Sequence, residues 1–146
     1  MSITIEQNKS LKAYNTFGLE ATAPYFCSVG SVEDLQAVLQ LPLAQQENLL
    51  ILGGGSNVLF TRNPEGLVLL NRIGGIEVEK EDAEHVWVTI GGGESWHDFV
   101  IYTITQGWGG VENLSLIPGT VGAAPMQNIG AYGVEIKDVF SYLLAV

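Results

Sequence analysis

The sequence predicts an α+β protein, built as a small N-terminal unit followed by a larger one. Two segments have the capping residues and apolar spacing of helices, and several short apolar or alternating runs have the pattern of strands. The third observation is glycine: 18 of the 146 residues, without a Gly-X-Y period, gathered where the expected strands end. With 47% hydrophobic and only 15% charged residues, much of the chain should be buried.

Both helices are predicted by a Ser-x-x-Asp capping box followed by an apolar stripe. The first begins at residues 31–34 and ends before Pro42, with an expected core face of Leu35, Val38 and Leu39. The second begins at residues 95–98 and ends near Gly107, a residue type favoured just beyond helix ends. Its core face should consist of Trp96, Phe99, Val100 and Ile104.

Strands are expected around Cys27 and at residues 49–52, 67–70, 76–79 and 85–90. The 49–52 and 67–70 runs are entirely apolar, which predicts burial on both faces, whereas the last two alternate and should be half exposed. An acidic run in this hairpin is interpreted as a solvated face: Glu77, Glu79, Glu81, Asp82 and Glu84. The final run, 140–146, also has the pattern of a strand, and its position suggests a fragment of a longer protein.

The net charge and the single cysteine limit the binding partners and the cellular compartment that the sequence allows. A net charge of −10 argues against nucleic acid or an anionic membrane as a partner. The N-terminus lacks the basic and apolar regions of a secretory signal, and the single cysteine, Cys27, is expected to be a buried, unreactive thiol. Together these features favour a reduced, cytoplasmic protein. Residues 113–134 carry no charge, but their prolines and glycines predict a buried, irregular loop system and not a membrane helix.

The first informative glycine group follows the apolar run 49–52. Gly53, Gly54 and Gly55 precede Ser56 and Asn57, so successive backbone N–H groups could form a nest for a phosphate. The loop is not a P-loop, because the Gly-Lys-Ser/Thr ending is missing, and Val58 occupies the position of the third glycine of a dinucleotide fingerprint. The groups at 74–75 and 91–93 are interpreted as ordinary turns.

The second informative region, residues 116–133, has small residues and amides where a surface loop would normally carry charge. No Lys or Arg occurs between Lys80 and Lys137, so an anion bound here would be met chiefly by backbone N–H groups. Thr120, Gln127 and Asn128 offer neutral hydrogen-bonding groups, and Tyr132 offers an amphipathic wall. These residue types predict a tight ligand cavity.

Three stretches, 14–18, 51–59 and 117–133, resemble the FAD-binding half of the UDP-N-acetylenolpyruvoylglucosamine reductase family, over nearly the whole chain. The resemblance implies a FAD-binding fold of the vanillyl-alcohol-oxidase (PCMH) type, in which two subdomains hold the cofactor. Residues 1–70 would be the small N-terminal subdomain and 71–146 the first part of the second. The C-terminal substrate domain would be absent.

Residue by residue, the resemblance implies that the first loop holds the FAD pyrophosphate and the second loop holds the rest. The implied cofactor residues are Gly53, Gly54, Gly55, Ser56, Asn57, Ile117, Pro118, Gly119, Thr120, Val121, Gly122, Ala123, Ala124, Gln127, Asn128, Gly130, Ala131, Tyr132 and Gly133. Tyr132 also resembles a tyrosine near the substrate channel. The first loop has no histidine, so FAD should be noncovalent. No metal site is expected, and His85 and His97 are interpreted as structural.

The resemblance further implies NADPH-dependent reduction of UDP-N-acetylglucosamine enolpyruvate to UDP-N-acetylmuramate, in peptidoglycan precursor synthesis. The family's catalytic arginine, serine and glutamate would lie beyond the matched part, so no catalytic residue is expected within this chain, which would be inactive alone. Two alternatives remain open at this stage. One is another flavin oxidoreductase of the same fold, and the other is a non-catalytic nucleotide-binding domain.

Overall fold

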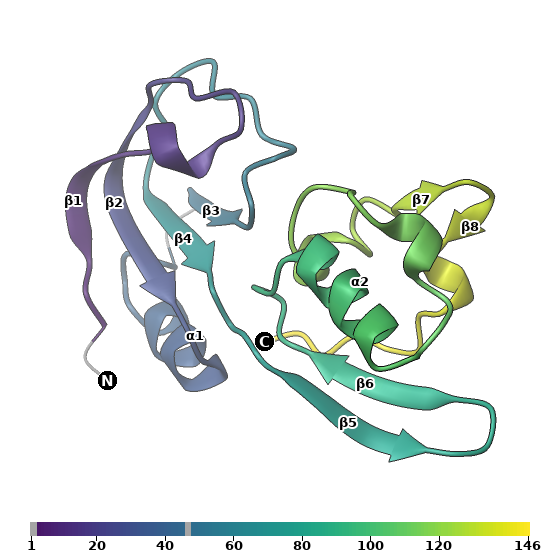
Figure 1. Cartoon of the computed structure of the whole chain (residues 1–146). Helices are drawn as coiled ribbons and strands as arrows, with labels where there is room; N and C mark the ends of the chain where they lie inside the picture. Colours follow the sequence, from purple (N-terminus) through teal and green to yellow (C-terminus); the bar gives the residue numbers. More distant parts are fainter. Residues whose placement is uncertain (1–2, 46–47) are drawn as a thin grey trace. The chain divides into compact units, whose positions relative to one another are not determined.

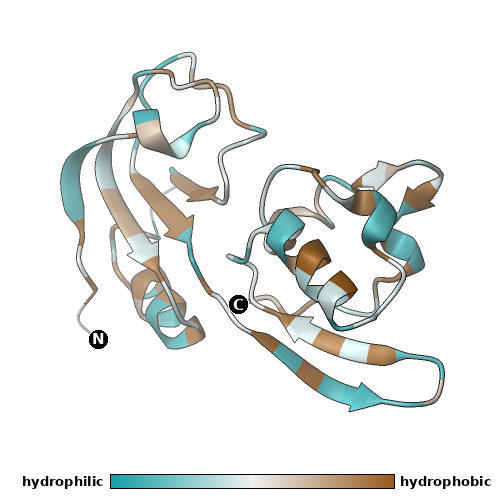
Figure 2. Cartoon of the chain, viewed as in Figure 1, coloured by the Kyte–Doolittle hydropathy of each residue, from teal (hydrophilic) through white to brown (hydrophobic). Residues whose placement is uncertain are grey.

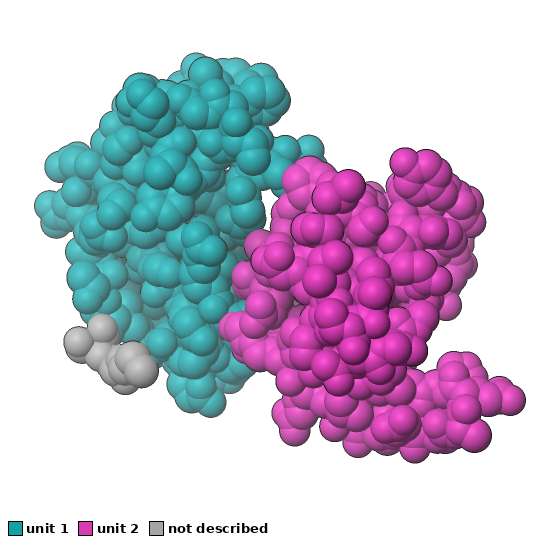
Figure 3. Space-filling model, viewed as in Figure 1, with its two compact units in different colours: residues 1–73, 146 teal, residues 74–145 magenta. Residues whose placement is uncertain are grey.

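The computed structural model describes residues 3–45 and 48–146, which form two compact units (Figure 3). The first unit comprises the described residues up to Ile73, together with Val146, and the second comprises Gly74–Ala145. The division falls close to the boundary expected after residue 70. That the two units are FAD-binding subdomains stays a prediction from the sequence.

The first unit is built on a four-stranded sheet in the order β1-β2-β4-β3 (Figure 1). β1 (Glu6–Ser10) pairs antiparallel with β2 (Thr22–Val29), and the two are joined through the short 3-10 helix Lys12–Tyr14. β4 (Leu67–Asn71) lies parallel to both β2 and β3 (Leu49–Leu52). Helix α1 (Val32–Leu39) lies between β2 and β3 in the chain.

The core of this unit lies on both faces of β4, whose residues 67–70 are all buried. Val68 and Leu70 pack into one apolar cluster, and Leu67 and Leu69 pack into the other, because successive strand residues point to opposite faces. Burial of β4 on both faces is therefore confirmed. The same expectation for β3 is wrong at Ile51, which is 62% exposed because β3 is the edge strand and has one neighbour only.

The second unit begins with an antiparallel hairpin of β5 (Ile76–Glu81) and β6 (Val86–Ile90), followed by α2 (Trp96–Thr105). Short 3-10 turns at Glu112–Leu114, Val121–Ala123 and Ile136–Asp138 alternate with the small hairpin β7 (Gly130–Ala131) and β8 (Val134–Glu135). The core packs the apolar face of α2 against these turns (Figure 2). Its buried members are Trp96, Phe99, Val100, Val111, Leu114, Ala124, Ile129 and Ile136.

Both predicted helix starts are confirmed. The Ser31 hydroxyl accepts a hydrogen bond from the N–H of Asp34 at 3.1 Å, which satisfies one of the open donors of α1. Ser95 caps α2 in the same way. The predicted core face of α2 is wrong at Ile104, which is 48% exposed. Thr103, seven residues after Trp96, faces the core instead, and its hydroxyl donates to the Val100 carbonyl at 2.8 Å.

Of the remaining predictions from the sequence, some are confirmed and others are wrong. Cys27 is buried in β2, where burial raises the pKa of its thiol, and the five acidic residues of the β5–β6 hairpin are exposed. Residues 140–146 form no strand, because no described strand pairs with them, and they are exposed. Residues 113–134 are irregular as predicted but not wholly buried, since Met126 is 87% exposed. Among the described residues, no helix is long and apolar enough to cross a membrane.

Candidate functional site

The first glycine loop, residues 53–57, leaves the end of β3 and lies against the segment that follows the first 3-10 helix. The Gly55 carbonyl accepts a hydrogen bond from the N–H of Thr16 at 3.2 Å. Gly55 has φ +68°, and a Cβ built there would lie 2.0 Å from the carbonyl oxygen of Tyr14. Both the backbone conformation and the close approach therefore require glycine at this position.

The segment that receives this loop is held by one buried amide, Asn15, which is 7% exposed. Its Nδ2 donates to the carbonyls of Leu11 at 2.8 Å and Leu19 at 3.0 Å. Its Oδ1 accepts from the N–H of Leu19 at 3.0 Å. Asn15 belongs to a stretch that carries the family resemblance, yet sequence reasoning assigned it no role. A single polar residue carries no periodic signal that could have separated it from an ordinary turn asparagine.

The backbone N–H groups of residues 53–57 donate to no acceptor among the described residues. Beside them, the Ser56 side chain is partly buried and that of Asn57 is exposed. Consecutive N–H groups without internal acceptors are the condition for an anion nest, and the hydroxyl and amide can add further donors. The local structure thus has the chemistry expected for a phosphate site.

The second loop is anchored to the turn that precedes α2, residues 91–95, like an added strand. The N–H of Val121 donates to the Glu94 carbonyl, and that of Gly122 donates to the Gly92 carbonyl, both at 2.9 Å. The N–H groups of residues 123 and 124 also donate within the loop. The N–H groups of 121–124 are therefore used internally, and an anion at this loop would have to be met by other N–H groups. Within residues 117–124, only 117, 119 and 120 keep N–H groups without an acceptor among the described residues.

The end of this region forms the β7–β8 hairpin, whose two-residue turn consists of Tyr132 and Gly133. Their φ angles of +53° and +82° make a type I′ turn, which holds the Tyr132 side chain 90% exposed. Asn128, just before the hairpin, also has a positive φ of +43° and an exposed side chain. The neutral side chains predicted as ligand groups therefore reach solvent, except Thr120, which is buried.

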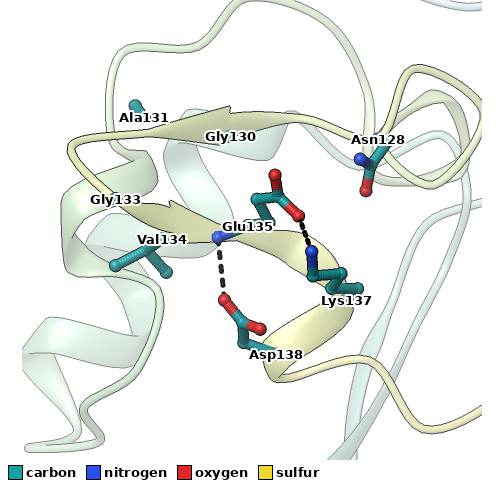
Figure 4. A pocket seen from close by; sticks show the side chains of 8 residues that line it. All are labelled: Asn128, Gly130, Ala131, Gly133, Val134, Glu135, Lys137 and Asp138. Carbon is teal, nitrogen blue, oxygen red and sulfur yellow. Dashed lines mark hydrogen bonds and ion pairs between the residues drawn. The ribbon is translucent and has the colours of Figure 1, made fainter.

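An open hollow of about 610 Å³ lies along this hairpin (Figure 4). Four of its lining residues are among those predicted from the sequence, and four are not: Asn128, Gly130, Ala131 and Gly133, then Val134, Glu135, Lys137 and Asp138.

The charged residues of the hollow are tied to one another. The Glu135 carboxylate pairs with the Lys137 ammonium, which raises the pKa of the lysine, and Asp138 Oδ2 accepts from the Glu135 N–H at 3.0 Å. Sequence reasoning noted Lys137 only as the first cation after Lys80. The structure places it on the wall of this hollow.

The histidines differ in their surroundings. His85 is exposed at the end of the β5–β6 turn, with its Nδ1 at 3.6 Å from an oxygen of Asp82. His97 lies in the first turn of α2, and its Nδ1 accepts a hydrogen bond from the N–H of Leu116 at 3.2 Å. His97 thus contacts the start of the second loop, a contact that the sequence alone did not indicate.

Comparisons with known proteins indicate the family to which the chain belongs. A family model described as "FAD binding domain" matches residues 23–146, which is most of the chain. The chain belongs to this family of FAD-binding domains. The match includes both glycine loops, and the α+β fold predicted from the sequence is confirmed.

Curated relatives of this FAD-binding domain are reductases. The chain is 54% identical, over 93% of its length, to UDP-N-acetylenolpyruvoylglucosamine reductase of Flavobacterium johnsoniae, of which it covers 40%. It is 53% identical over its full length to the reductase of the same name from Pseudomonas putida, covering 43% of that protein. The FAD-binding domain therefore spans about two fifths of the length of the curated relatives it matches.

A solved structure shares the fold. The crystal structure of UDP-N-acetylenolpyruvylglucosamine reductase (MurB) from Thermus caldophilus matches with a TM-score of 0.65 at 28% sequence identity. The match covers 94% of the FAD-binding domain described here and 46% of that protein. The resemblance recognised in three sequence stretches thus extends through the backbone of nearly the whole chain.

Proposed function

We propose that this FAD-binding domain is the cofactor-binding part of a UDP-N-acetylenolpyruvoylglucosamine reductase. In that enzyme, NADPH serves to reduce UDP-N-acetylglucosamine enolpyruvate to UDP-N-acetylmuramate, a step of peptidoglycan precursor synthesis in the cytoplasm. Identities of 50% and above over nearly the whole chain support the assignment. The observation in the structure that carries it is the row of backbone N–H groups at residues 53–57 without internal acceptors.

The first loop fits the pyrophosphate of FAD. Five successive N–H groups can donate to phosphate oxygens, and the Ser56 hydroxyl and Asn57 amide lie in the same loop. Gly55 keeps the loop close to residues 14–16, and its carbonyl is held by the N–H of Thr16. Because the loop contains no histidine, the domain holds FAD noncovalently in this proposal.

The second loop fits the less charged part of the cofactor. Its N–H groups at 121–124 are used internally, so it offers small residues and neutral side chains and little positive potential. In the proposal, residues 117–124 and 127–133 contact FAD, and Tyr132 stands near the substrate. The exposed side chains of Gln127, Asn128 and Tyr132 can reach a ligand without rearrangement of the hairpin.

When bound, FAD would supply the hydride chemistry that the reduction of the enolpyruvyl double bond by NADPH needs. This domain's own residues bind and orient the cofactor. No residue of the chain is assigned the proton transfer that completes the reduction, so that group and most of the substrate site belong to other parts of the whole enzyme. Alone, the chain is expected to bind FAD weakly and not to turn over.

The test is FAD binding by the 146-residue chain, followed by flavin absorption after desalting and by titration of fluorescence. We expect retained flavin that acid denaturation releases, because the attachment is noncovalent. Asn57→Asp places a carboxylate in the nest and should raise the Kd for FAD about tenfold or more, by electrostatic repulsion of the pyrophosphate. Asn63→Asp, the same change at an exposed position outside the loop, should leave the Kd unchanged.

Two results would count against the proposal. Equal effects of the two aspartate variants would exclude the loop as the pyrophosphate site. Substrate-dependent oxidation of NADPH by this chain alone would show that the catalytic groups lie within it.

A further inference from the structure

We propose that His97 is a positioning residue for the second loop. Its imidazole fixes the backbone at Leu116 and thereby sets the direction in which residues 117–124 begin. The inference rests on the proposed function of that loop. Neither the sequence analysis nor the similarity to reductases assigns His97 any part in binding.

The backbone at Leu116 has a conformation that the residue does not adopt by itself. Its φ is +62°, a left-handed conformation in which Cβ crowds the backbone of any residue except glycine. Its side chain is 78% exposed, so no packing of that side chain holds the conformation in place. Strained residues of this kind persist only when surrounding contacts over-determine them. The support must therefore come from backbone contacts.

His97 supplies such a contact. The N–H of Leu116 donates to Nδ1 of His97 at 3.2 Å, from the first turn of α2. Nδ1 accepts this bond only in the neutral tautomer that carries its proton on Nε2. The helix itself is well anchored, because Ser95 caps it and Trp96 is 3% exposed in the core. The imidazole thus extends from an anchored backbone and is partly buried.

The same turn of α2 attaches the loop at two neighbouring points. Trp96 Nε1 donates to the Leu114 carbonyl at 2.7 Å, a buried bond, and the N–H of Trp96 donates to the Gly119 carbonyl at 3.1 Å. The Leu116 contact lies between them in the sequence. Without the contact from His97, nothing from α2 would hold Leu116 between the attachments at Leu114 and Gly119. Leu116 directly precedes the N–H groups of 117, 119 and 120, so a change in its backbone would change where they point.

The experiment compares three variants of the 146-residue chain. His97→Phe keeps a ring and removes the acceptor, whereas His97→Asn places an amide oxygen near the position of Nδ1. His85→Phe is the matched control, because it makes the same change at an exposed histidine outside the loop. The first readout, which needs no FAD, is hydrogen exchange at the Leu116 amide. Exchange at Val100, buried in α2, reports whether the helix stays folded.

In His97→Phe we expect exchange at Leu116 to rise about two- to tenfold, and the Kd for FAD to rise by a similar factor, since one net hydrogen bond is lost. His97→Asn should restore both values to within about twofold, and His85→Phe should change neither. Rescue by asparagine separates a role of the acceptor from a role of ring packing, which asparagine does not replace.

The outcomes are distinguishable. An unchanged exchange rate at Leu116 in His97→Phe, with Val100 still protected, overturns the role of His97 and leaves the proposed function intact. Failure of His97→Asn to rescue overturns it as well. Failure of the unaltered chain to bind FAD overturns the proposed function of the loop, and the flavin role of His97 with it, whatever the exchange rates show.

Discussion

The two glycine-rich loops look alike in the sequence and differ in how they use their backbone. Residues 53–57 leave all their N–H groups without acceptors among the described residues, whereas residues 121–124 donate all of theirs within their own unit. The first loop thus has N–H groups that an anion could use, whereas residues 121–124 of the second use their N–H groups to hold the loop in place. Glycine content therefore does not by itself indicate a phosphate site. What distinguishes the two loops is whether each backbone N–H group has an acceptor within the protein.

The loops also differ in why glycine is needed. At Gly55 a backbone oxygen lies too close to the Cβ position for any side chain, and the positive φ adds a penalty for residues other than glycine. In the second region, positive φ is found at Gly119 and Gly133, but also at Leu116, Asn128 and Tyr132, which are not glycine. The first loop is thus built from residues that avoid strain, and the second accepts strain at exposed positions, a pattern found at ligand sites.

The sharpest test of this comparison is Gly55→Ala. The new Cβ would lie 2.0 Å from the Tyr14 carbonyl, which cannot move as a side chain can, and φ is +68°. We expect a loss of about 2–5 kcal/mol in the free energy of unfolding, from the conformational penalty and the overlap together. Gly18→Ala is the control: φ is +62° with nothing within 4 Å, so only about 1–2 kcal/mol should be lost. Urea unfolding measures both, and equal losses would contradict the close approach.

Asn15→Leu tests whether the buried amide supports the first loop. The leucine removes three hydrogen bonds and leaves the carbonyls of Leu11 and Leu19 without their buried donor. We expect unfolding to become easier by about 2–3 kcal/mol, because three hydrogen bonds of an amide that is 7% exposed are lost together. In Asn63→Ala, which removes one exposed bond to the N–H of Thr22, the loss should stay below about 1 kcal/mol. Thermal or urea unfolding would contradict the role of Asn15 if both variants behaved alike.

Gly122→Ala is the corresponding test in the second loop. A Cβ there would lie 2.9 Å from the Gly92 carbonyl, and φ is not positive, so the overlap acts alone. A loss of about 1–2 kcal/mol is expected, smaller than at Gly55. Gly109→Ala, where the nearest atom is 3.9 Å away on the Glu112 side chain, should change stability by less than about 0.5 kcal/mol. A larger effect at Gly122 than at Gly55 would reverse the comparison of the two loops.

The smallest expected effect is a gain in the free energy of unfolding. Tyr132→Asn places a residue that tolerates left-handed backbone at φ +53°, in a turn where the tyrosine ring is 90% exposed and packs against little. The free energy of unfolding should rise by about 0.5–1 kcal/mol. If Tyr132 is kept for ligand contact, the same variant should bind FAD or substrate more weakly. A stabilised variant with unchanged binding would remove Tyr132 from the proposed site.

Much of the fold could be predicted from local pattern. The caps at Ser31 and Ser95, the buried run 67–70 and the acidic hairpin follow from spacing, because side-chain period decides which face an element buries. The wrong predictions concern features that depend on whether another strand lies alongside. Ile51 is exposed because β3 has a partner on one side only, and residues 140–146 form no strand because nothing described pairs with them. An apolar run in the sequence does not indicate which strand, if any, will pair with it.

The candidate site follows the same division. Residue types in the two loops predicted ligand chemistry, and in the described part of the chain the N–H groups of 53–57 meet no acceptor. The internal use of the N–H groups at 121–124, the buried bonds of Asn15 and the contact of His97 with Leu116 each join residues through space. No spacing in the sequence indicates which acceptor an N–H group will meet.

By itself, the sequence determined the elements, the two glycine loops and their resemblance to FAD-binding reductases, because these depend on residue identity and local order. The tertiary structure decided which loop keeps N–H groups without acceptors among the described residues, where a close approach leaves no room for a Cβ, and which histidine contacts the second loop. The physical reason is that hydrogen-bond partners and close approaches are set by backbone brought together from distant positions. Gly55 against Tyr14 is one such approach, and Leu116 against His97 is another.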